Sequence, residues 1–186
     1  MIYTHYHCFG DEYKNRYYIS KDCLKEQLSF MTKSSKEFCV TIDDGHKSIY
    51  EIAFPVLTEF EIPMIVFIVS SDIGKRNVNV SQIQEMSKYG ISFQSHSNSH
   101  INHYLLNNTQ ILNEGLRSKE IIENITGKMV SQYAFPHGAY SIRFCKLLKT
   151  IGFNEFFTSD YGARETKDDG IIINDRIEIF KNFAKT

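Results

Sequence analysis

The sequence predicts an α/β fold built on a parallel sheet, and two observations lead to this prediction. Apolar runs of strand length alternate with amphipathic stretches of helical spacing along the 186 residues. The run from Ile62 to Val69 is apolar on both faces, as a central strand of a parallel sheet requires. This alternation is compatible with an open sheet and with a sheet closed into a barrel.

The expected strands are short, rich in β-branched or aromatic residues and bounded by turn residues. They are expected at Ile2–Tyr6, Phe38–Ile42, Ile62–Val69, Ile91–Gln94, Val130–Phe135, Phe153–Phe157 and Ile171–Ile173. The polar segment from Ser159 to Gly170 is expected to be a loop.

The expected helices place apolar residues on one face at helical spacing. Ser81, Thr109 and Ser141 are predicted as N-caps, and Gly90 and Gly152 as the glycines that end two of the helices. The helices are expected within Leu24–Met31, Ile49–Phe60, Ser81–Gly90, Thr109–Ile122 and Ser141–Gly152.

Composition indicates one globular domain over residues 1–186. Hydrophobic residues make up 42% of the chain and charged residues 23%, and with three prolines no proline-rich linker divides it. A net charge of -1 excludes nucleic acid as the main expected partner. The longest apolar run, Met64–Val69, is too short to cross a bilayer, so no integral membrane segment is expected.

The N-terminus shows neither the basic nor the apolar region of an export signal, so a cytoplasmic location is expected. In that compartment the four cysteines, which form no CxxC pair, are expected to be reduced thiols.

Three polar clusters follow expected strands, at the ends where parallel α/β folds gather their catalytic groups. One contains His96 and His100, whose spacing on a helical turn would let both imidazoles reach one cation. Position 97 is Ser, so the zincin motif, which needs Glu there, is excluded. The alternative is a pair of solvent-exposed loop histidines.

The second cluster is Asp43-Asp44-Gly45, and the third is Pro136-His137-Gly138. Adjacent carboxylates repel each other unless a cation or a shared proton compensates, and one can bind a metal while its neighbour faces a water molecule. The alternative is a helix N-cap beside an exposed acid. Two imidazoles and one carboxylate together form the ligand set of a hydrolytic metal site, with the other carboxylate as general base.

Thr41-Ile42-Asp43-Asp44-Gly45 resembles the T-F-D-D-G motif of the polysaccharide deacetylase family, also called the NodB homology domain or carbohydrate esterase family 4. His96 to His100 matches its H-[ST]-x-x-H motif, and Ala134 to Gly138 resembles a divergent R-x-P-x-G motif. The order and separations fit, and Tyr6-His7 resembles the Y-H that often begins such domains. The resemblance covers nearly the whole chain.

The resemblance implies a distorted, incomplete (β/α) barrel of about seven parallel strands that carries a divalent metal. Asp43 matches the general base. Asp44, His96 and His100 match the metal ligands, for which zinc is expected on ligand type, with cobalt, nickel and iron left open. The family's acetate- and oxyanion-holding wall is matched by Pro136, His137 and Gly138.

This sequence departs from the family pattern at three places. The Arg that orients the base is replaced by Ala134, and Arg176 is the candidate to take its place. The fourth motif is not recognisable, and no histidine follows position 137 to serve as the fifth-motif general acid. The candidates for that acid are His7 and His46, and less so His103 and His137.

The expected function is metal-dependent hydrolysis of the N-acetyl group of a sugar or polysaccharide, with metal-activated water as nucleophile and an N-acetylated sugar or glycan as partner. One alternative is a non-catalytic relative that binds sugar or metal. The other is a non-haem iron oxygenase, which shares the two-His, one-carboxylate ligand set but not the strand–helix alternation.

Overall fold

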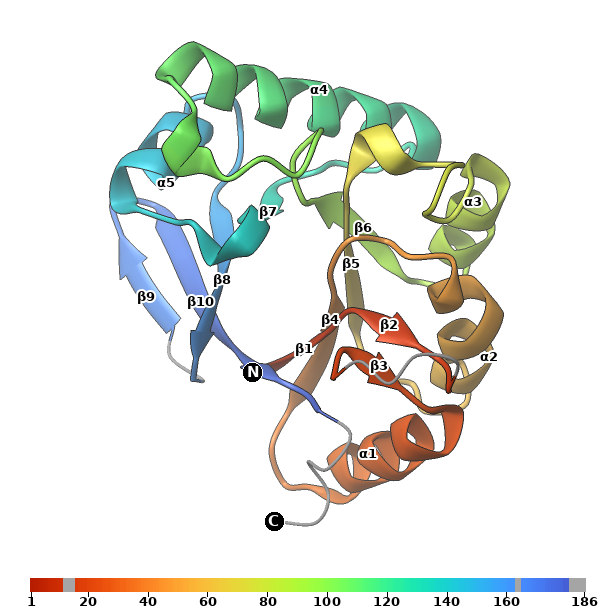
Figure 1. Ribbon diagram of the computed structural model, residues 1–186. Coiled ribbons are helices and arrows are strands. Elements are labelled where there is room, and N and C mark those ends of the chain that lie inside the picture. Colours follow the sequence, from red (N-terminus) through yellow and green to blue (C-terminus); the bar gives the residue numbers. More distant parts are fainter. Residues whose placement is uncertain (12–15, 163–164, 181–186) are drawn as a thin grey trace.

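A computed structural model of the protein, which describes residues 1–11, 16–162 and 165–180, has a ring of parallel strands at its centre (Figure 1). Around the ring the strand order is β1-β4-β5-β6-β7-β8-β10, and β1 pairs with β10 to close it. The expected barrel of seven parallel strands is therefore confirmed among the described residues. Its strands are β1 Ile2–Tyr6, β4 Phe38–Ile42, β5 Met64–Ile68, β6 Ser92–Ser95, β7 Gln132–Ala134, β8 Glu155–Tyr161 and β10 Ile171–Glu178.

The seams of the barrel differ in length, which makes it distorted. β1 and β4 pair over five residues, whereas β6 and β7 share one paired position, Ser95 with Tyr133. The closing seam pairs Thr4 with Ile177 and His5 with Glu178. Because this seam lies at the end of β1 and β10, it brings side chains from the two ends of the chain to one mouth.

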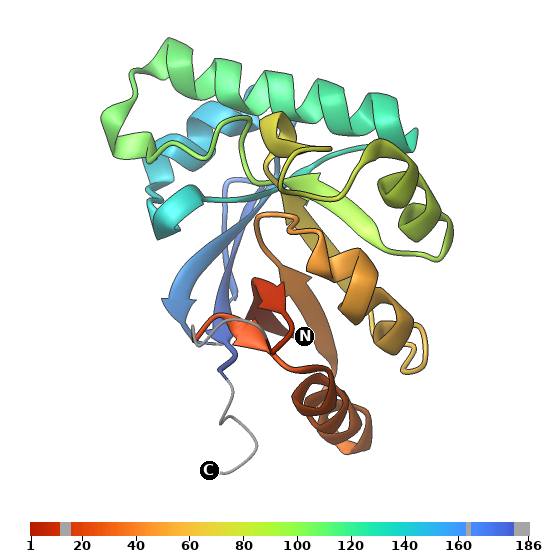
Figure 2. The same ribbon diagram turned by 45° about the vertical axis from the view of Figure 1, so that its right-hand side comes forward.

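Helices lie outside the ring of strands, and Figures 1 and 2 show α4 running along one whole side. Each helix connects successive parallel strands, as βαβ units require. The α-helices are α1 Lys21–Lys33, α2 Phe54–Leu57, α3 Val80–Lys88, α4 Asn108–Thr126 and α5 Ile142–Lys149, with shorter turns at η1 Ile49–Ala53, η2 Ser70–Asp72, η3 His103–Leu105 and η4 Pro136–Gly138. None of the helices in the described ranges is long and apolar enough to cross a membrane.

The barrel divides the apolar residues between two cores. The larger core fills the space between strands and helices and includes Val66, Ile83 and Phe156. A smaller cluster comprises Cys39, Ile65, Phe67, Ala134 and Phe157. The Arg176 guanidinium carbon lies 5.6 Å from the centre of the Phe67 ring, so a charged side chain sits directly on this second cluster.

Two of the expected N-caps are wrong. Helix α3 is capped by Asn79 and α4 by Asn107, not by Ser81 and Thr109. In both helices the Asn side chain accepts from the third residue of the helix, and that residue, a Gln, bonds back to the cap backbone. This reciprocal pair satisfies two N–H groups at once, which a hydroxyl inside the first turn does not. Ser141 caps α5 as expected.

The expected end of the chain's last strand is also wrong. Strand β10 continues past Ile173 to Glu178, although Asn174, Asp175 and Arg176 are polar, because all three are buried. A register shift between Asn174 and Arg176 accompanies this polar stretch. The expected loop 159–170 contains the end of β8 and strand β9, Glu165–Asp168, which pairs antiparallel with β10; residues 163–164 lie outside the described residues.

Three smaller elements also differ from expectation. A parallel pair of two-residue strands, β2 Cys8–Phe9 and β3 Tyr18–Ile19, was not predicted. The expected helix over 49–60 begins as a π-helical turn, in which Phe54 N–H bonds to the Ile49 carbonyl. Pro55, next along, has no N–H to continue the usual ladder.

Gly45 lies in the turn that follows β4, where the chain must change direction sharply. Its φ is +89°, and a Cβ built there would lie 2.5 Å from Ile68 Cγ1 in the neighbouring strand β5. Gly74 has a similar φ of +74°, but no atom lies within 4 Å of its Cβ position. The two glycines thus share a backbone requirement and differ in the space around them.

We predict that Gly45→Ala lowers the free energy of unfolding by about 1–3 kcal/mol more than Gly74→Ala, because it adds overpacking to the left-handed backbone cost of about 1–2 kcal/mol that both variants bear. Urea unfolding of the two variants measures the difference. Equal losses would show that Ile68 moves aside without cost.

Candidate metal and catalytic centre

A cavity of about 380 Å³ lies at the carboxyl ends of the barrel strands. It is lined by groups from β1, from the turn after β4, from the loop after β6 and from the turn after β7, and it also contains Arg16 and Tyr17. The histidines and aspartates in its lining are His5, His7, Asp43, Asp44, His96, His100 and His137. The strand ends therefore bring all three sequence clusters into one hollow.

Asp44, His96 and His100 form a group whose candidate ligand atoms lie within 4.8 Å of one another. Asp44 Oδ1 lies 3.3 Å from His100 Nε2 and 3.6 Å from His96 Nε2. The Asp44 and His100 side chains are 39% and 32% exposed, so the group is open to the cavity on one side. This donor set of two imidazoles and one carboxylate fits a divalent transition metal.

Neighbouring groups fix the orientation of the two histidines. His96 Nδ1 lies 2.9 Å from the Ala134 carbonyl oxygen, which favours a proton on Nδ1 and a bare Nε2 facing Asp44. The loop after His96 is held by Glu114 of α4, whose carboxylate accepts from the N–H groups of Asn98 and Ser99 and from the Ser99 hydroxyl at 2.7–3.0 Å. The histidines are thus positioned by a clamped loop and not by the helical turn that their spacing suggested.

Four non-glycine residues of the cavity region have left-handed backbone angles. Asp44, Ser97, His100 and His137 have φ values of 67°, 64°, 57° and 59°. Left-handed backbone angles are unfavourable for residues that have a Cβ atom. Residues with such angles are concentrated at functional sites, where surrounding contacts stabilise the strained backbone. At Asp44 the holding contacts to its carbonyl come from Asn77 Nδ2 at 2.6 Å and Val69 N–H at 3.2 Å.

Asp43 lines the same cavity but is almost fully buried, and its carboxylate is paired with Arg176. The guanidinium donates two parallel bonds, Nη1 to Oδ1 at 2.7 Å and Nη2 to Oδ2 at 2.8 Å. Burial alone would raise the pKa of Asp43, but the charges of Arg176, His5 and His96 hold that pKa well below its usual range. Arg176, the candidate named from the sequence to orient the base, is thus bonded to Asp43.

His5 is a residue of this centre that the sequence analysis missed. Its Nε2 lies 2.9 Å from Asp43 Oδ2, and both side chains are about 96% buried. The His5 and His7 rings are in contact, with centroids 4.5 Å apart. Burial and the adjacent His5 lower the pKa of His7 to about 4. The signal available in the sequence is the two-residue spacing of His5, in the expected strand, and His7 just beyond it, which puts both side chains on one side of an extended chain.

The other candidates for the general acid differ in their surroundings. His46 lies in the neighbouring hollow, where its Nδ1 is 2.9 Å from Ser48 Oγ and accepts from Ser48 N–H. His103 is fully buried outside the cavity, with Nε2 2.8 Å from the Tyr133 hydroxyl. His137 lines the cavity and packs on His100, with ring centroids 4.5 Å apart.

The third-motif turn forms one wall of the cavity. His137 is at the cavity surface, Pro136 is buried beneath it, and the Gly138 N–H bonds back to the Phe135 carbonyl. Of the three residues predicted to hold substrate, His137 is therefore the one that the structure places in the cavity lining.

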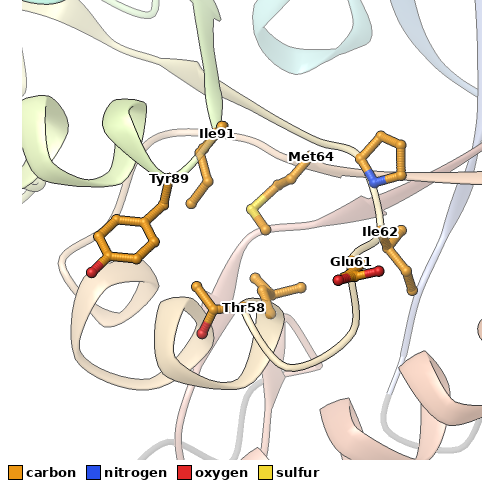
Figure 3. Close-up of a pocket in the computed structure, with 9 residues that line it drawn as sticks. Thr58, Glu61, Ile62, Met64, Tyr89 and Ile91 are labelled. Atoms are coloured by element: carbon orange, nitrogen blue, oxygen red, sulfur yellow. The ribbon is translucent and has the colours of Figure 1, made fainter.

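A separate hollow lies at the opposite ends of β5 and β6 (Figure 3). It has a volume of about 320 Å³ and is lined mainly by apolar and uncharged side chains, with Glu61 as its one acidic group. Its lining offers no cluster of metal-ligating groups like the one at the strand ends that carry Asp43 and Asp44.

The family model for polysaccharide deacetylases matches residues 31–156, which contain the Asp pair, both histidines of the metal group and the third-motif turn. The chain belongs to the polysaccharide deacetylase family. This confirms the resemblance drawn from the three motifs.

Two relatives of this family member have descriptive names. YxkH of Bacillus subtilis (strain 168), named as a polysaccharide deacetylase, is 29% identical over 160 residues, covering 83% of this chain and 57% of YxkH. A poly-beta-1,6-N-acetyl-D-glucosamine N-deacetylase of Staphylococcus aureus (strain MRSA252) is 24% identical, covering 75% and 54%. The chain thus spans a little over half the length of these relatives.

Solved structures confirm the fold. Streptococcus pyogenes deacetylase PplD, solved in complex with acetate, superposes with a TM-score of 0.89 at 18% identity, covering 98% of this chain and 93% of that one. IcaB from Ammonifex degensii superposes with a TM-score of 0.86 at 21% identity, covering 97% and 92%. At these sequence identities, the structural similarity shows the barrel fold alone.

We predict that Arg176→Met lowers the free energy of unfolding by about 3–5 kcal/mol, because it leaves the buried Asp43 carboxylate without its cation. The double variant Arg176→Met/Asp43→Asn should recover part of that loss, because the uncompensated charge is gone. Urea unfolding measures both, and exposed Arg143→Met is the control, with a change within about 0.5 kcal/mol. A double variant no more stable than Arg176→Met would contradict the charge argument.

Proposed function

We propose that this family member is a metal-dependent hydrolase that removes N-acetyl groups from an N-acetylated sugar or glycan. The observation that supports this most is the separation of the two aspartates. Asp44 faces two histidines at an open cavity, while Asp43 is held beside them as a buried, ionised carboxylate. A hydrolase of this kind needs both a ligand and a base within reach of one water molecule.

Asp44, His96 and His100 would hold the metal, and zinc suits their mixed nitrogen and oxygen donors. A bound divalent ion supplies Lewis-acid polarisation of the acetamide carbonyl and lowers the pKa of water. The protein's own part is to present the two imidazoles. Burial and the neighbouring His96 lower the pKa of His100 to about 4, so the His100 ring is neutral near pH 7.

Asp43 is the proposed general base. Its pKa is held below the usual range, so it is ionised near neutral pH and able to accept the proton of the attacking water. Arg176 holds the carboxylate on its buried side. Asp43 Oδ2 lies 3.8 Å from His96 Nε2, and this short distance supports a base that works beside the proposed metal ligands.

His7 is the proposed general acid, in preference to His46. His7 lines the same cavity as Asp43, and its nitrogen lies within 4.8 Å of an Asp43 oxygen, whereas His46 is bonded to Ser48 in the neighbouring hollow. With a pKa of about 4, His7 is neutral at rest and must gain a proton before it can protonate the leaving amine. The proton that Asp43 takes from water is the nearest source.

The wall at His137 is proposed to contact the acetyl group, as the family match of this turn implies. The named relative from Staphylococcus aureus acts on a poly-N-acetylglucosamine, and short N-acetylglucosamine oligomers are therefore the first substrates to test. The cytoplasmic location expected from the sequence stays a prediction. For a protein in that compartment, lipid-linked or nucleotide-linked N-acetyl sugars are further substrates to test.

The second candidate function is a non-catalytic sugar- or metal-binding relative. The observation that favours it is the absence of the fourth and fifth family motifs, the latter of which supplies the usual acid. A protein that binds zinc and short glycans but releases no acetate would support this candidate.

We predict that Asp43→Asn lowers kcat for acetate release by about 10²–10⁴-fold, because the base is lost. Its bound zinc should stay near one ion per chain. Asp44→Asn is the matched neighbour and should lose both the ion and the activity. Acetate release and metal content of purified protein measure the contrast, and an active Asp43→Asn protein would refute the base assignment.

We predict that His7→Gln lowers kcat by about 10²-fold or more and that His46→Gln, matched in residue type, changes it much less, because only His7 reaches Asp43 within one cavity. Metal content and thermal unfolding of the two variants check that both proteins stay intact. A larger loss in His46→Gln would exchange the two roles.

A further inference from the structure

His5 lies on the buried side of the base, in a position that the proposed steps do not yet use. It is 4% exposed, it is carried by β1 at the closing seam of the barrel, and its Nε2 is 2.9 Å from Asp43 Oδ2. Among the described residues no group forms a hydrogen bond with this nitrogen, and the 2.9 Å contact with Asp43 does not itself have the geometry of one. A buried polar nitrogen without a second partner is costly unless this one contact serves it.

The charges around His5 decide what it can offer to Asp43. Burial and the positive charge of Arg176 lower the pKa of His5, so the ring is neutral near pH 7. A neutral imidazole carries one N–H, and the carboxylate that lies 2.9 Å from Nε2 is that of Asp43. The proton therefore belongs on Nε2, as a third donor to Asp43 beside the two bonds from Arg176.

A second cation is the competing explanation, because His5, His7 and Asp43 also have candidate ligand atoms within 4.8 Å of one another. Arg176 opposes this explanation. Both Asp43 oxygens already accept from its guanidinium at 2.7–2.8 Å, and a divalent ion on the same carboxylate would face that positive charge at short range in a buried setting.

We propose that His5 is a positioning residue, a neutral Nε2–H donor that with Arg176 fixes the Asp43 carboxylate in its working orientation. This inference rests on the proposed function for its kinetic consequence, but the hydrogen bond itself does not. Arg176 bonds to both carboxylate oxygens, and His5 adds a further contact at Oδ2.

The kinetic test compares three variants. His5→Leu removes the donor and should lower kcat by about 10–100-fold, as loss of orienting partners commonly does, with KM and zinc content unchanged. His5→Gln restores an amide N–H at similar reach and should recover most of that loss. Thr4→Val changes the next buried polar side chain of β1, whose hydroxyl bonds to the Cys39 carbonyl, and should leave kcat unaltered.

A structural role alone would give a different pattern. His5→Leu and His5→Gln would then lose kcat in proportion to their thermal stability, with no recovery in Gln. Full kcat in His5→Leu would overturn the proposal, and so would two zinc ions per chain falling to one in that variant, which would mark a second cation site.

A second readout is independent of activity. In ¹⁵N-labelled protein, NMR of the imidazole nitrogens should place the His5 proton on Nε2, and the resonance of this proton should shift in Asp43→Asn. A bare Nε2 would overturn the proposal even in an active enzyme. A wild-type protein that shows the Nε2 proton but releases no acetate would contradict the proposed function and leave the contact with Asp43 standing.

Discussion

The ion pair of Arg176 and Asp43 is the constraint on which the rest of the centre depends. Both side chains are almost fully buried, and an isolated charge of either sign in that position would be prohibitively costly. The pair is compatible with folding only if the ends of β4 and β10 are held at bonding distance, and these strands are neighbours of β1 on either side. Closure of the barrel at the β1–β10 seam is therefore what makes this buried carboxylate possible.

The same constraint explains why two adjacent carboxylates behave differently. Asp43 is buried against Arg176 and His5, whereas Asp44 is about two-fifths exposed and faces two imidazoles. Fixed protein groups compensate the charge of Asp43, whereas the carboxylate of Asp44 stays available to an ion. When two neighbouring carboxylates lie in different environments, they commonly take different roles, such as base and ligand. The left-handed angle at Asp44 turns its side chain away from that of Asp43.

Much of the centre could be predicted from the sequence, because its motifs are local. Asp43, Asp44, His96 and His100 follow strands that their own apolar runs reveal, and parallel strand ends must meet. Arg176 could only be suggested as a candidate, since its polar neighbours led to the expectation that the strand ends at Ile173. His5 was missed because a histidine inside a strand is read as part of the alternation, and nothing local shows that it faces Asp43 across β1 and β4. The Asn caps were missed because hydroxyl residues stand just behind them.

The contacts that hold the histidine loop show why such a centre needs a helix as well as strands. Ser97 and His100 have backbone angles that their side chains disfavour, and a free loop would relax from them. Glu114 prevents this by accepting three bonds from Asn98 and Ser99, and it does so from the middle of α4, a helix of 19 residues packed along the barrel. Because an ionised carboxylate accepts several bonds at once, one side chain can hold two consecutive backbone N–H groups and a hydroxyl. The position of His100 beside Asp44 thus depends on helix packing as much as on the strand that precedes it.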